Sequence, residues 1–138
     1  MGKNNKAFQF RIYPTEEQKE LFAKTFGCCR FIYNQMLSDK NEEYKKTGKM
    51  LKTTPAAYKK EFPWLKEVDS LALANVQLHL ERAYRNFFER PEIGFPKFKS
   101  KHHSRNTYTT NLVNGNIRLF ENGIKLPKAG VVKAKIHR

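Results

Sequence analysis

The chain has 138 residues, of which 39% are apolar and 13% aromatic, and 27 Lys and Arg against 13 Asp and Glu give a net charge of +14. This length fits one domain or a small two-part module with a core, which excludes a multi-domain machine and full-length disorder. No window holds the roughly 18 apolar residues of a membrane helix, so we expect a cytoplasmic protein without a membrane partner. The only cysteines, Cys28 and Cys29, are neighbours, which excludes a disulfide scaffold and a zinc ribbon.

Residues 7–13 alternate between apolar and polar side chains, which predicts a half-buried strand that ends at Pro14. Thr15 followed three residues later by Gln18 is a capping-box pattern and predicts the start of a helix.

Apolar residues then recur at helical spacing in three stretches separated by Gly and Pro. The expected helices are residues 16–47, as one helix or two divided near Gly27 and stopped at Gly48, then residues 55–62, and residues 70–90 with Asp69 or Ser70 as the N-cap.

After a linker at residues 91–105 the period becomes that of strands, at residues 107–112, 117–120, 124–126 and 131–136. Asn114-Gly115 and Asn122-Gly123 lie between alternating segments and predict hairpin turns. An isolated meander is marginal in water, so we expect these strands to recruit residues 7–13 and to close into a barrel.

The predicted fold class is therefore α+β: a small oligonucleotide-binding-like β-barrel with a helical insertion between its first and second strands. The expected domain organisation is a first barrel strand at 1–14, a helical lobe at 15–90, a basic and aromatic linker at 91–105, and the remaining barrel strands at 106–138.

The basic residues are concentrated in the C-terminal third of the chain. Residues 97–138 contain ten Lys and Arg and a single acid, Glu121, a balance of +9. Phe, Tyr, Thr and Asn are interleaved with them, which favours nucleic acid over a membrane surface as the partner. A solvated basic face kept for solubility is the alternative, although one net charge in ten residues exceeds what solubility requires.

We find no set of residues that predicts catalysis, a metal site, a cofactor or a small-molecule substrate. The acids fall mostly on predicted helix surfaces or caps, where pairing with Lys or with the helix dipole is their ordinary role. His79 fits a partly buried structural residue, and the adjacent His102 and His103 fit phosphate-side contacts or solvent-exposed residues. Two histidines do not make a four-ligand zinc site.

Residues 94–101 alternate aromatic and basic side chains after a glycine. Aromatic rings stack on bases while lysines neutralise phosphates, so this segment is a candidate nucleic-acid contact. Phe95 and Phe98 could instead fill the seam between helix and barrel. Arg11, Arg30 and Asn34 could contact phosphate or brace the strand-to-helix junction.

Six short motifs together resemble a known family. They are Lys6-Ala7-Phe8 with Arg11-Ile12-Tyr13-Pro14, Gly27-Cys28-Cys29-Arg30-Phe31-Ile32-Tyr33-Asn34, Ala83-Tyr84-Arg85-Asn86-Phe87-Phe88, Gly94-Phe95-Pro96-Lys97-Phe98-Lys99, Tyr108-Thr109-Thr110 and Leu126-Pro127-Lys128. In this order they resemble the N-terminal part of the TnpB (OrfB) proteins of insertion sequences, which are similar to type V CRISPR effectors.

The resemblance implies a nucleic-acid-binding wedge barrel interrupted by a helical recognition lobe, which older descriptions call a helix-turn-helix. It also implies that cleavage is performed by a later RuvC-like domain with three acidic metal ligands, so we expect no enzyme activity from this chain alone. The implied partners are a guide RNA, double-stranded DNA and the missing nuclease half.

The resemblance also implies which residues bind. Contacts to a short DNA motif would be made by Thr53, Ser70, Leu71, Ala74, Asn75, Val113 and Asn114. Contacts to a nucleic-acid backbone would be made by Arg11, Arg30, Asn34, Lys97, Lys99, Lys101, Arg105, Arg118 and Lys125. Small and apolar side chains among the motif-reading positions suit a thymine methyl better than guanine.

Two other classes remain open from the sequence. A standalone helix-turn-helix-type DNA-binding regulator would share the charge and the paired helices. An RNA-binding ribosomal or chaperone-like protein would share the basic barrel.

Overall fold

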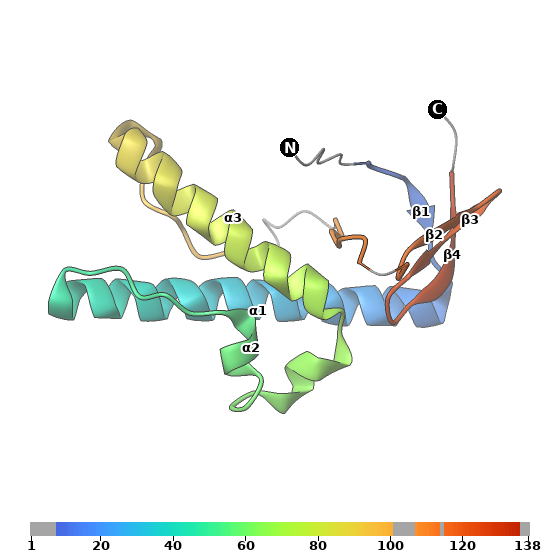
Figure 1. Ribbon diagram of the computed structural model, residues 1–138, viewed down its shortest axis with the longest axis horizontal. Coiled ribbons are helices and arrows are strands. Elements are labelled where there is room, and N and C mark those ends of the chain that lie inside the picture. The colour runs from blue at the N-terminus through green and yellow to red at the C-terminus, as the bar shows by residue number, and fades with distance from the viewer. Residues whose placement is uncertain (1–7, 101–106, 114, 136–138) are drawn as a thin grey trace. The chain divides into compact units, whose positions relative to one another are not determined.

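A computed structural model describes residues 8–100, 107–113 and 115–135. In chain order the elements are β1 (Ile12–Tyr13), α1 (Glu16–Thr47), α2 (Pro55–Tyr58), the 3-10 helix η1 (Pro63–Glu67), α3 (Ser70–Glu89), the 3-10 helix η2 (Pro91–Ile93), β2 (Arg118–Phe120), β3 (Gly123–Leu126) and β4 (Gly130–Ala134) (Figure 1). They fall into two compact units, residues 1–20 with 112–138 and residues 21–111. The α+β class is confirmed. No helix of the described residues is long and apolar enough to cross a membrane.

The predicted capping box opens α1. The backbone N–H of Thr15 donates to Oε1 of Gln18 (2.9 Å), and the backbone N–H of Gln18 donates to Oγ1 of Thr15 (3.2 Å). Nε2 of Gln18 also donates to the carbonyl oxygens of Ala129 (3.3 Å) and Val131 (2.8 Å). One side chain therefore caps the helix and holds the hairpin between β3 and β4.

Of the two forms expected for the first helical stretch, a single helix is correct. α1 continues through Gly27 and ends at Thr47. Gly48 follows with a φ of 72°, a left-handed conformation that glycine adopts without a steric penalty, and its N–H donates to the carbonyl of Tyr44 (2.8 Å).

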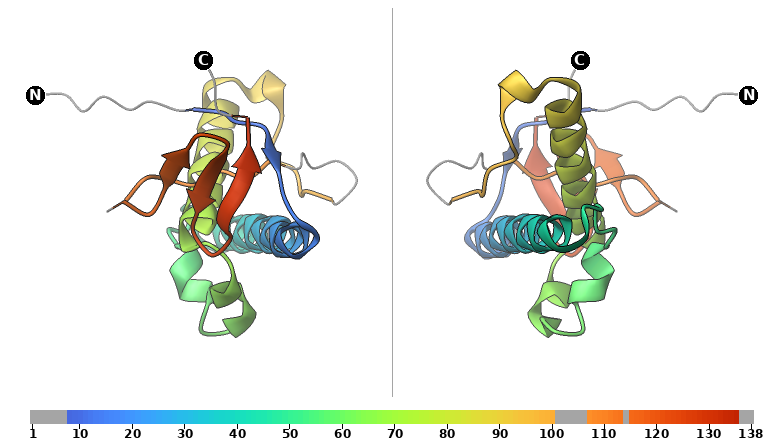
Figure 2. Two further views of the ribbon diagram at one scale, coloured as in Figure 1. Left: turned by 90° about the vertical axis from the view of Figure 1, so that its right-hand side faces the viewer. Right: turned by 90° about the vertical axis from the view of Figure 1, so that its left-hand side faces the viewer.

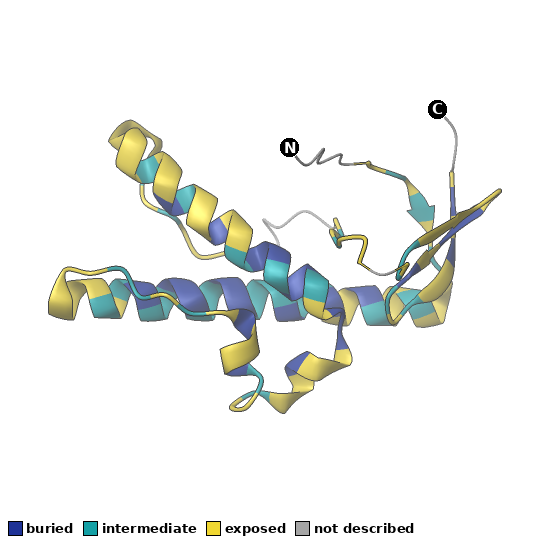
Figure 3. Ribbon diagram, viewed as in Figure 1, coloured by how far each residue is buried: buried dark blue, intermediate teal, exposed yellow. Residues whose placement is uncertain are grey.

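The core of the helical unit lies where α3 crosses α1, and the buried positions of both helices gather there (Figures 1 and 3). Ile32, Met36 and Leu37 of α1 and Leu73 and Leu80 of α3 are completely buried. Ile32 and Met36 are four residues apart, and Leu73 and Leu80 are seven apart, which are spacings that place side chains on one face of a helix. Burial of that face, more than helix propensity, holds the two helices together.

The predicted helix at 55–62 is shorter in the structure, because α2 ends at Tyr58 and η1 begins at Pro63. The hydroxyl of Tyr58 donates to Oδ2 of Asp39 on α1 (2.6 Å). The ring of Trp64, the only tryptophan in the chain, contacts Phe31 of α1 edge-on, with ring centroids 4.8 Å apart. Trp64 fluorescence should therefore report unfolding of the helical unit.

The strand predicted at 107–112 is wrong. Residues 107–113 form no strand, and residues 107–111 belong to the helical unit, which holds Tyr108 through its side chain. The ring of Tyr108 packs on Phe22 of α1 (5.3 Å between centroids), and its hydroxyl donates to Oδ2 of the buried Asp69. Asp69 is also the N-cap of α3, since its Oδ1 accepts from the N–H of Leu71 (3.0 Å).

The remaining strands form an antiparallel sheet in the order β1-β4-β3-β2, visible side by side in the left-hand view of Figure 2. The strand predicted at 7–13 is confined to Ile12 and Tyr13 among the described residues. β1 and β2 lie at opposite edges, so the sheet of the described residues is open. Closure into an oligonucleotide-binding-like barrel stays a prediction.

The hairpin predicted at Asn122-Gly123 is present, but Gly123 lies in β3 rather than in the turn. A Cβ on Gly123 would come within 3.1 Å of both Cγ1 of Val131 and the carbonyl oxygen of Val132. This glycine therefore permits a close approach between β3 and β4.

Buried tyrosines make the helical unit sensitive to alkali. Burial, with a smaller contribution from Tyr33, raises the pKa of Tyr84 from 10.0 to about 12, and its hydroxyl donates to Oδ1 of Asn41 (2.8 Å). The folded state thus resists ionisation of this phenol, so its stabilising effect is complete below pH 10 and is lost as the pH rises through 12. We expect the free energy of unfolding, measured by urea titration of Trp64 fluorescence, to fall across this range. The free energy of unfolding should fall less steeply with pH in Tyr84→Phe than in the unchanged protein. An identical dependence on pH in the two proteins would contradict the role given to Tyr84.

Candidate nucleic-acid interface

One face of the sheet combines exposed basic and aromatic side chains. Arg118 of β2 lies opposite Lys125 of β3, which lies opposite Val131 of β4. Tyr13 of β1 lies opposite Lys133 of β4. Side chains of directly opposite residues point to the same face of a sheet, and so do side chains two residues apart on one strand. Phe120 therefore lies on the same face as Arg118. All six side chains are exposed, including Tyr13 (47%) and Phe120 (46%). We call this set the basic sheet face.

The opposite face of the sheet is apolar. Ile124 pairs with Val132, and Ile12 pairs with Ala134. Ile124, Val132 and Ala134 are buried. The alternation along β3 and β4 therefore separates apolar side chains from the basic ones, and it places the predicted contacts Arg118 and Lys125 side by side.

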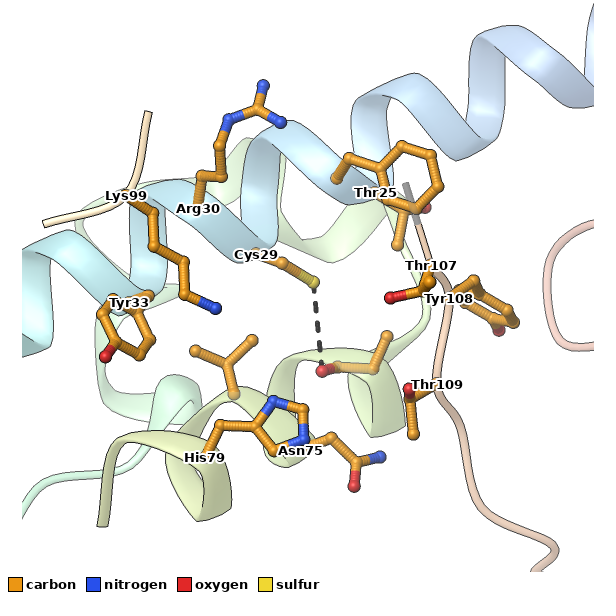
Figure 4. A pocket seen from close by; sticks show the side chains of 13 residues that line it. Thr25, Cys29, Arg30, Tyr33, Asn75, His79, Lys99, Thr107, Tyr108 and Thr109 are labelled. Carbon is orange, nitrogen blue, oxygen red and sulfur yellow. Dashed lines mark hydrogen bonds between the residues drawn. The ribbon is translucent and has the colours of Figure 1, made fainter. Parts of the chain in front are cut away.

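The helical unit contains a second feature, a cavity of about 320 Å³ between α1, α3 and the segment at 107–109 (Figure 4). Its walls include three of the predicted site residues, Arg30, Asn75 and Lys99, which are far apart in sequence. The other lining residues are Thr25, Phe26, Cys29, Tyr33, Ala72, Val76, His79, Thr107, Tyr108 and Thr109. We call this space the helical cavity.

Asn34 holds Lys99 in place. Nδ2 of Asn34 donates to the carbonyl of Lys99 (2.9 Å), and the N–H of Lys99 donates to Oδ1 of Asn34 (2.8 Å). Nζ of Lys99 lies 4.5 Å from the centroid of the Tyr33 ring, within the range of a cation–π interaction. Both polar atoms of the Asn34 amide are thus engaged with the chain itself, which makes Asn34 a positioning residue.

The helical cavity is electropositive. Lys99 and Arg30 are among its walls, Asp and Glu are not, and among the described residues no carboxylate forms an ion pair with either cation. Desolvation, then the charges of Lys99 and Arg82, lowers the pKa of His79, and this residue is exposed rather than partly buried as the sequence predicted. In Figure 4 the Lys99 side chain extends into the cavity, whereas the Arg30 guanidinium extends away from His79 and Asn75.

Cys29 is a weak nucleophile here. Burial and the neighbouring Cys28 raise the pKa of its thiol to about 12, and Sγ lies 3.9 Å from the carbonyl oxygen of Ala72. A thiol of this kind is protonated at neutral pH. The described residues also contain no group of three or more His, Cys, Asp or Glu that could hold a metal ion.

The positions expected to read a DNA motif differ in accessibility. Ser70 is exposed at the start of α3, and Leu71 and Ala74 are half-buried. Asn75 is buried, and its Nδ2 donates to the carbonyl of Leu71 (2.9 Å), which braces the helix. Thr53 is half-buried before α2. The structure thus places Asn75 in a bracing bond, and its role in binding DNA stays a prediction.

The other predicted contacts are less concentrated. Val113 is exposed in the unit that contains the sheet, and Arg11 is exposed next to β1. Lys97 is exposed in the aromatic and basic segment. Phe95 of the same segment packs on Tyr84 and Phe87, whereas Phe98 is 59% exposed. Lys101, Arg105 and Asn114, with His102 and His103, lie outside the described residues.

Sequence reasoning missed several residues of these surfaces. Lys133 belongs to the basic sheet face, and the strand alternation at 131–134 could have shown it. The threonines and Tyr33 of the helical cavity had no local signal, because contacts between distant segments bring them together.

A basic sheet face and an electropositive cavity in an α+β fold are typical of nucleic-acid-binding proteins. Residues 1–49 match the helix-turn-helix domain of the IS605 OrfB family. The Salmonella dublin virulence protein VsdF is 37% identical over 106 residues, which cover 66% of this chain and 89% of VsdF. The chain belongs to the TnpB (OrfB) family of insertion-sequence proteins.

Two further relatives are much longer than this chain. InsQ of Escherichia coli K12, provisionally named an RNA-guided DNA endonuclease, is 32% identical over 146 residues that cover 99% of this chain. A Streptomyces pristinaespiralis protein, provisionally given the same name, is 32% identical over 112 residues that cover 76% of it. The matches span only 35% and 28% of these two relatives.

The region that matches the helix-turn-helix domain is dominated by one long helix. Residues 16–47 form one uninterrupted helix, so the matched region contains no turn between two helices within that range. A helix-turn-helix places its second helix in the major groove, and the next long helix of this chain is α3, which packs against α1.

Proposed function

We propose that this chain is the nucleic-acid-binding region of an RNA-guided DNA endonuclease, active in the cytoplasm together with a nuclease domain. Its partners would be a guide RNA and double-stranded DNA. The basic sheet face would hold a nucleic-acid backbone, as part of a wedge barrel formed by residues 1–14 and 106–138. Residues 15–90 would be the recognition lobe, and residues 91–105 the linker.

The observation that carries this proposal is the cross-strand pair of Arg118 and Lys125. Like charges directly opposite one another destabilise a sheet, so this pair is costly unless an anion lies across it. Exposed Tyr13 and Phe120 on the same face add surfaces on which bases can stack. A polyanion with stacking bases satisfies both features.

Reading of a DNA motif would be a function of the first turns of α3, at Ser70, Leu71, Ala74 and Asn75, with Thr53, Val113 and Asn114. The loop that carries Thr53 is anchored by Lys40, whose buried ammonium donates to the carbonyl of Leu51 (2.5 Å). A side chain on an anchored backbone is better placed for specific contacts than one on an unrestrained loop.

The test removes the charges of the pair and keeps polar, flexible side chains there, in the double variant Arg118→Gln, Lys125→Gln. For a duplex of about 20 base pairs we expect weaker binding for every sequence. The slope of log affinity against log salt should fall by roughly 0.9 for each lost contact. Binding is measured by fluorescence anisotropy on labelled RNA and DNA duplexes.

The matched control is Lys60→Gln, Lys66→Gln, which removes two exposed charges from the helical unit. It should leave the salt slope unchanged. An equal loss of slope in both double variants would contradict a role for the basic sheet face. Binding confined to structured RNA, with no affinity for DNA, would favour a ribosomal or chaperone-like protein.

A further inference from the structure

We propose that the helical cavity takes up one unstacked nucleotide, with its phosphate at Lys99 and its base against the wall formed by Tyr33 and Val76. This inference rests on the proposed function, because the nucleotide belongs to a bound strand. It adds a single-nucleotide site to the helical unit, separate from the basic sheet face.

The charge of the helical cavity points to a phosphate. Nζ of Lys99 extends into it, and among the described residues no carboxylate neutralises this cation (Figure 4). The hydroxyl-bearing residues Thr107 and Thr109 line the same space and are exposed, so they are accessible from solvent. Ammonium and hydroxyl groups are the donors that proteins direct at phosphate oxygens.

The remaining walls fit a base. Phe26, Tyr33, Ala72 and Val76 supply apolar and aromatic surface, and the imidazole of His79 supplies a further ring. Proteins hold extruded bases by stacking on such side chains together with a few polar contacts at the base edge. Cavities of 300 Å³ and above are in the size range of small-ligand sites, and this one measures about 320 Å³.

The position of Lys99 is also set in advance of binding. The paired hydrogen bonds from Asn34 fix the backbone of Lys99, and the Tyr33 ring lies beside its ammonium. A preformed cation loses little conformational freedom when it meets a phosphate, which favours binding.

The experiment compares a fully paired (matched) duplex with a duplex that carries one unpaired nucleotide (a bulge). The comparison is made once with RNA duplexes and once with DNA duplexes. The full chain should bind the bulged duplex about tenfold more tightly than the matched duplex, in RNA, in DNA or in both. The nucleic acid that shows this preference is the source of the nucleotide. The readout is the ratio of the two dissociation constants, which is insensitive to general backbone affinity. Equal affinity for bulged and matched duplexes in both pairs would overturn the proposal.

Two variants locate the site. Lys99→Met should reduce the bulge preference to near one. Lys97→Met removes a charge from the same exposed segment outside the cavity and should weaken binding of both duplexes alike. Ala72→Leu should abolish the preference by filling the cavity, whereas Ala83→Leu, on the same helix but not among the lining residues, should retain it.

The outcomes separate this site from the proposed function. If neither duplex binds, the nucleic-acid role fails, and the cavity proposal fails with it. If both duplexes bind equally well, only the cavity proposal fails. Urea titration of Trp64 fluorescence shows whether each variant is folded, and a folded Lys99→Met protein that keeps the bulge preference would overturn the proposal.

Discussion

Affinity for a nucleic-acid duplex should fall on the order of 10³ to 10⁵ between about 50 and 200 mM salt, the range expected for six to ten phosphate contacts. Ten Lys and Arg against one acid in residues 97–138 supply the charge, and Arg118, Lys125 and Lys133 place part of it on one exposed face. Each phosphate that a cation neutralises releases a counterion, and added salt opposes that release. Fluorescence anisotropy across the salt series measures the slope.

A control separates this effect from unfolding. Trp64 fluorescence recorded at every salt concentration should not change, because the fully buried residues of the helical core are apolar. A dissociation constant that changes by less than about tenfold over this range would contradict a polyanion partner.

Leu73→Ala should lower the free energy of unfolding of the helical unit by about 2 to 5 kcal/mol. Leu73 is completely buried in the cluster formed by α1 and α3, so truncation removes apolar contacts and leaves a cavity. Small domains are stable by only about 5 to 15 kcal/mol, and the loss is therefore a large part of the total. Urea unfolding followed by Trp64 fluorescence measures it.

Leu78→Ala is the matched control, because Leu78 lies on the same helix and is 52% exposed. Its effect should stay within about 0.5 kcal/mol, the usual range for surface substitutions. An equal loss of unfolding free energy in Leu73→Ala and Leu78→Ala would show that the side of α3 that faces the core has been misassigned.

The features that the sequence predicts well are those governed by neighbouring residues. The capping box of Thr15 and Gln18, the stop at Gly48 and the N-cap Asp69 are all observed, since each depends on a few adjacent groups. The short strands predicted at 124–126 and 131–136 likewise correspond to β3 and β4.

The features that the sequence could not predict depend on distant partners. Residues 107–112 alternate like a strand, but Tyr108 contacts Phe22 and Asp69 of the helical unit instead of a neighbouring strand. Gly123 fits a turn residue from its neighbours, and only the closeness of Val131 explains its place in a strand. The helical cavity depends on the bond between Asn34 and Lys99, which are 65 positions apart.

That bond between Asn34 and Lys99 has a consequence for the order of folding. α1 and α3 are local structures that form quickly, whereas joining residues 65 positions apart requires closure of a long loop. The wall of the helical cavity that contains Lys99 should therefore be completed after the helices have docked. Amide exchange at Lys99 would then occur through local opening, well before the core exchanges, and a nucleotide held in the cavity would slow it.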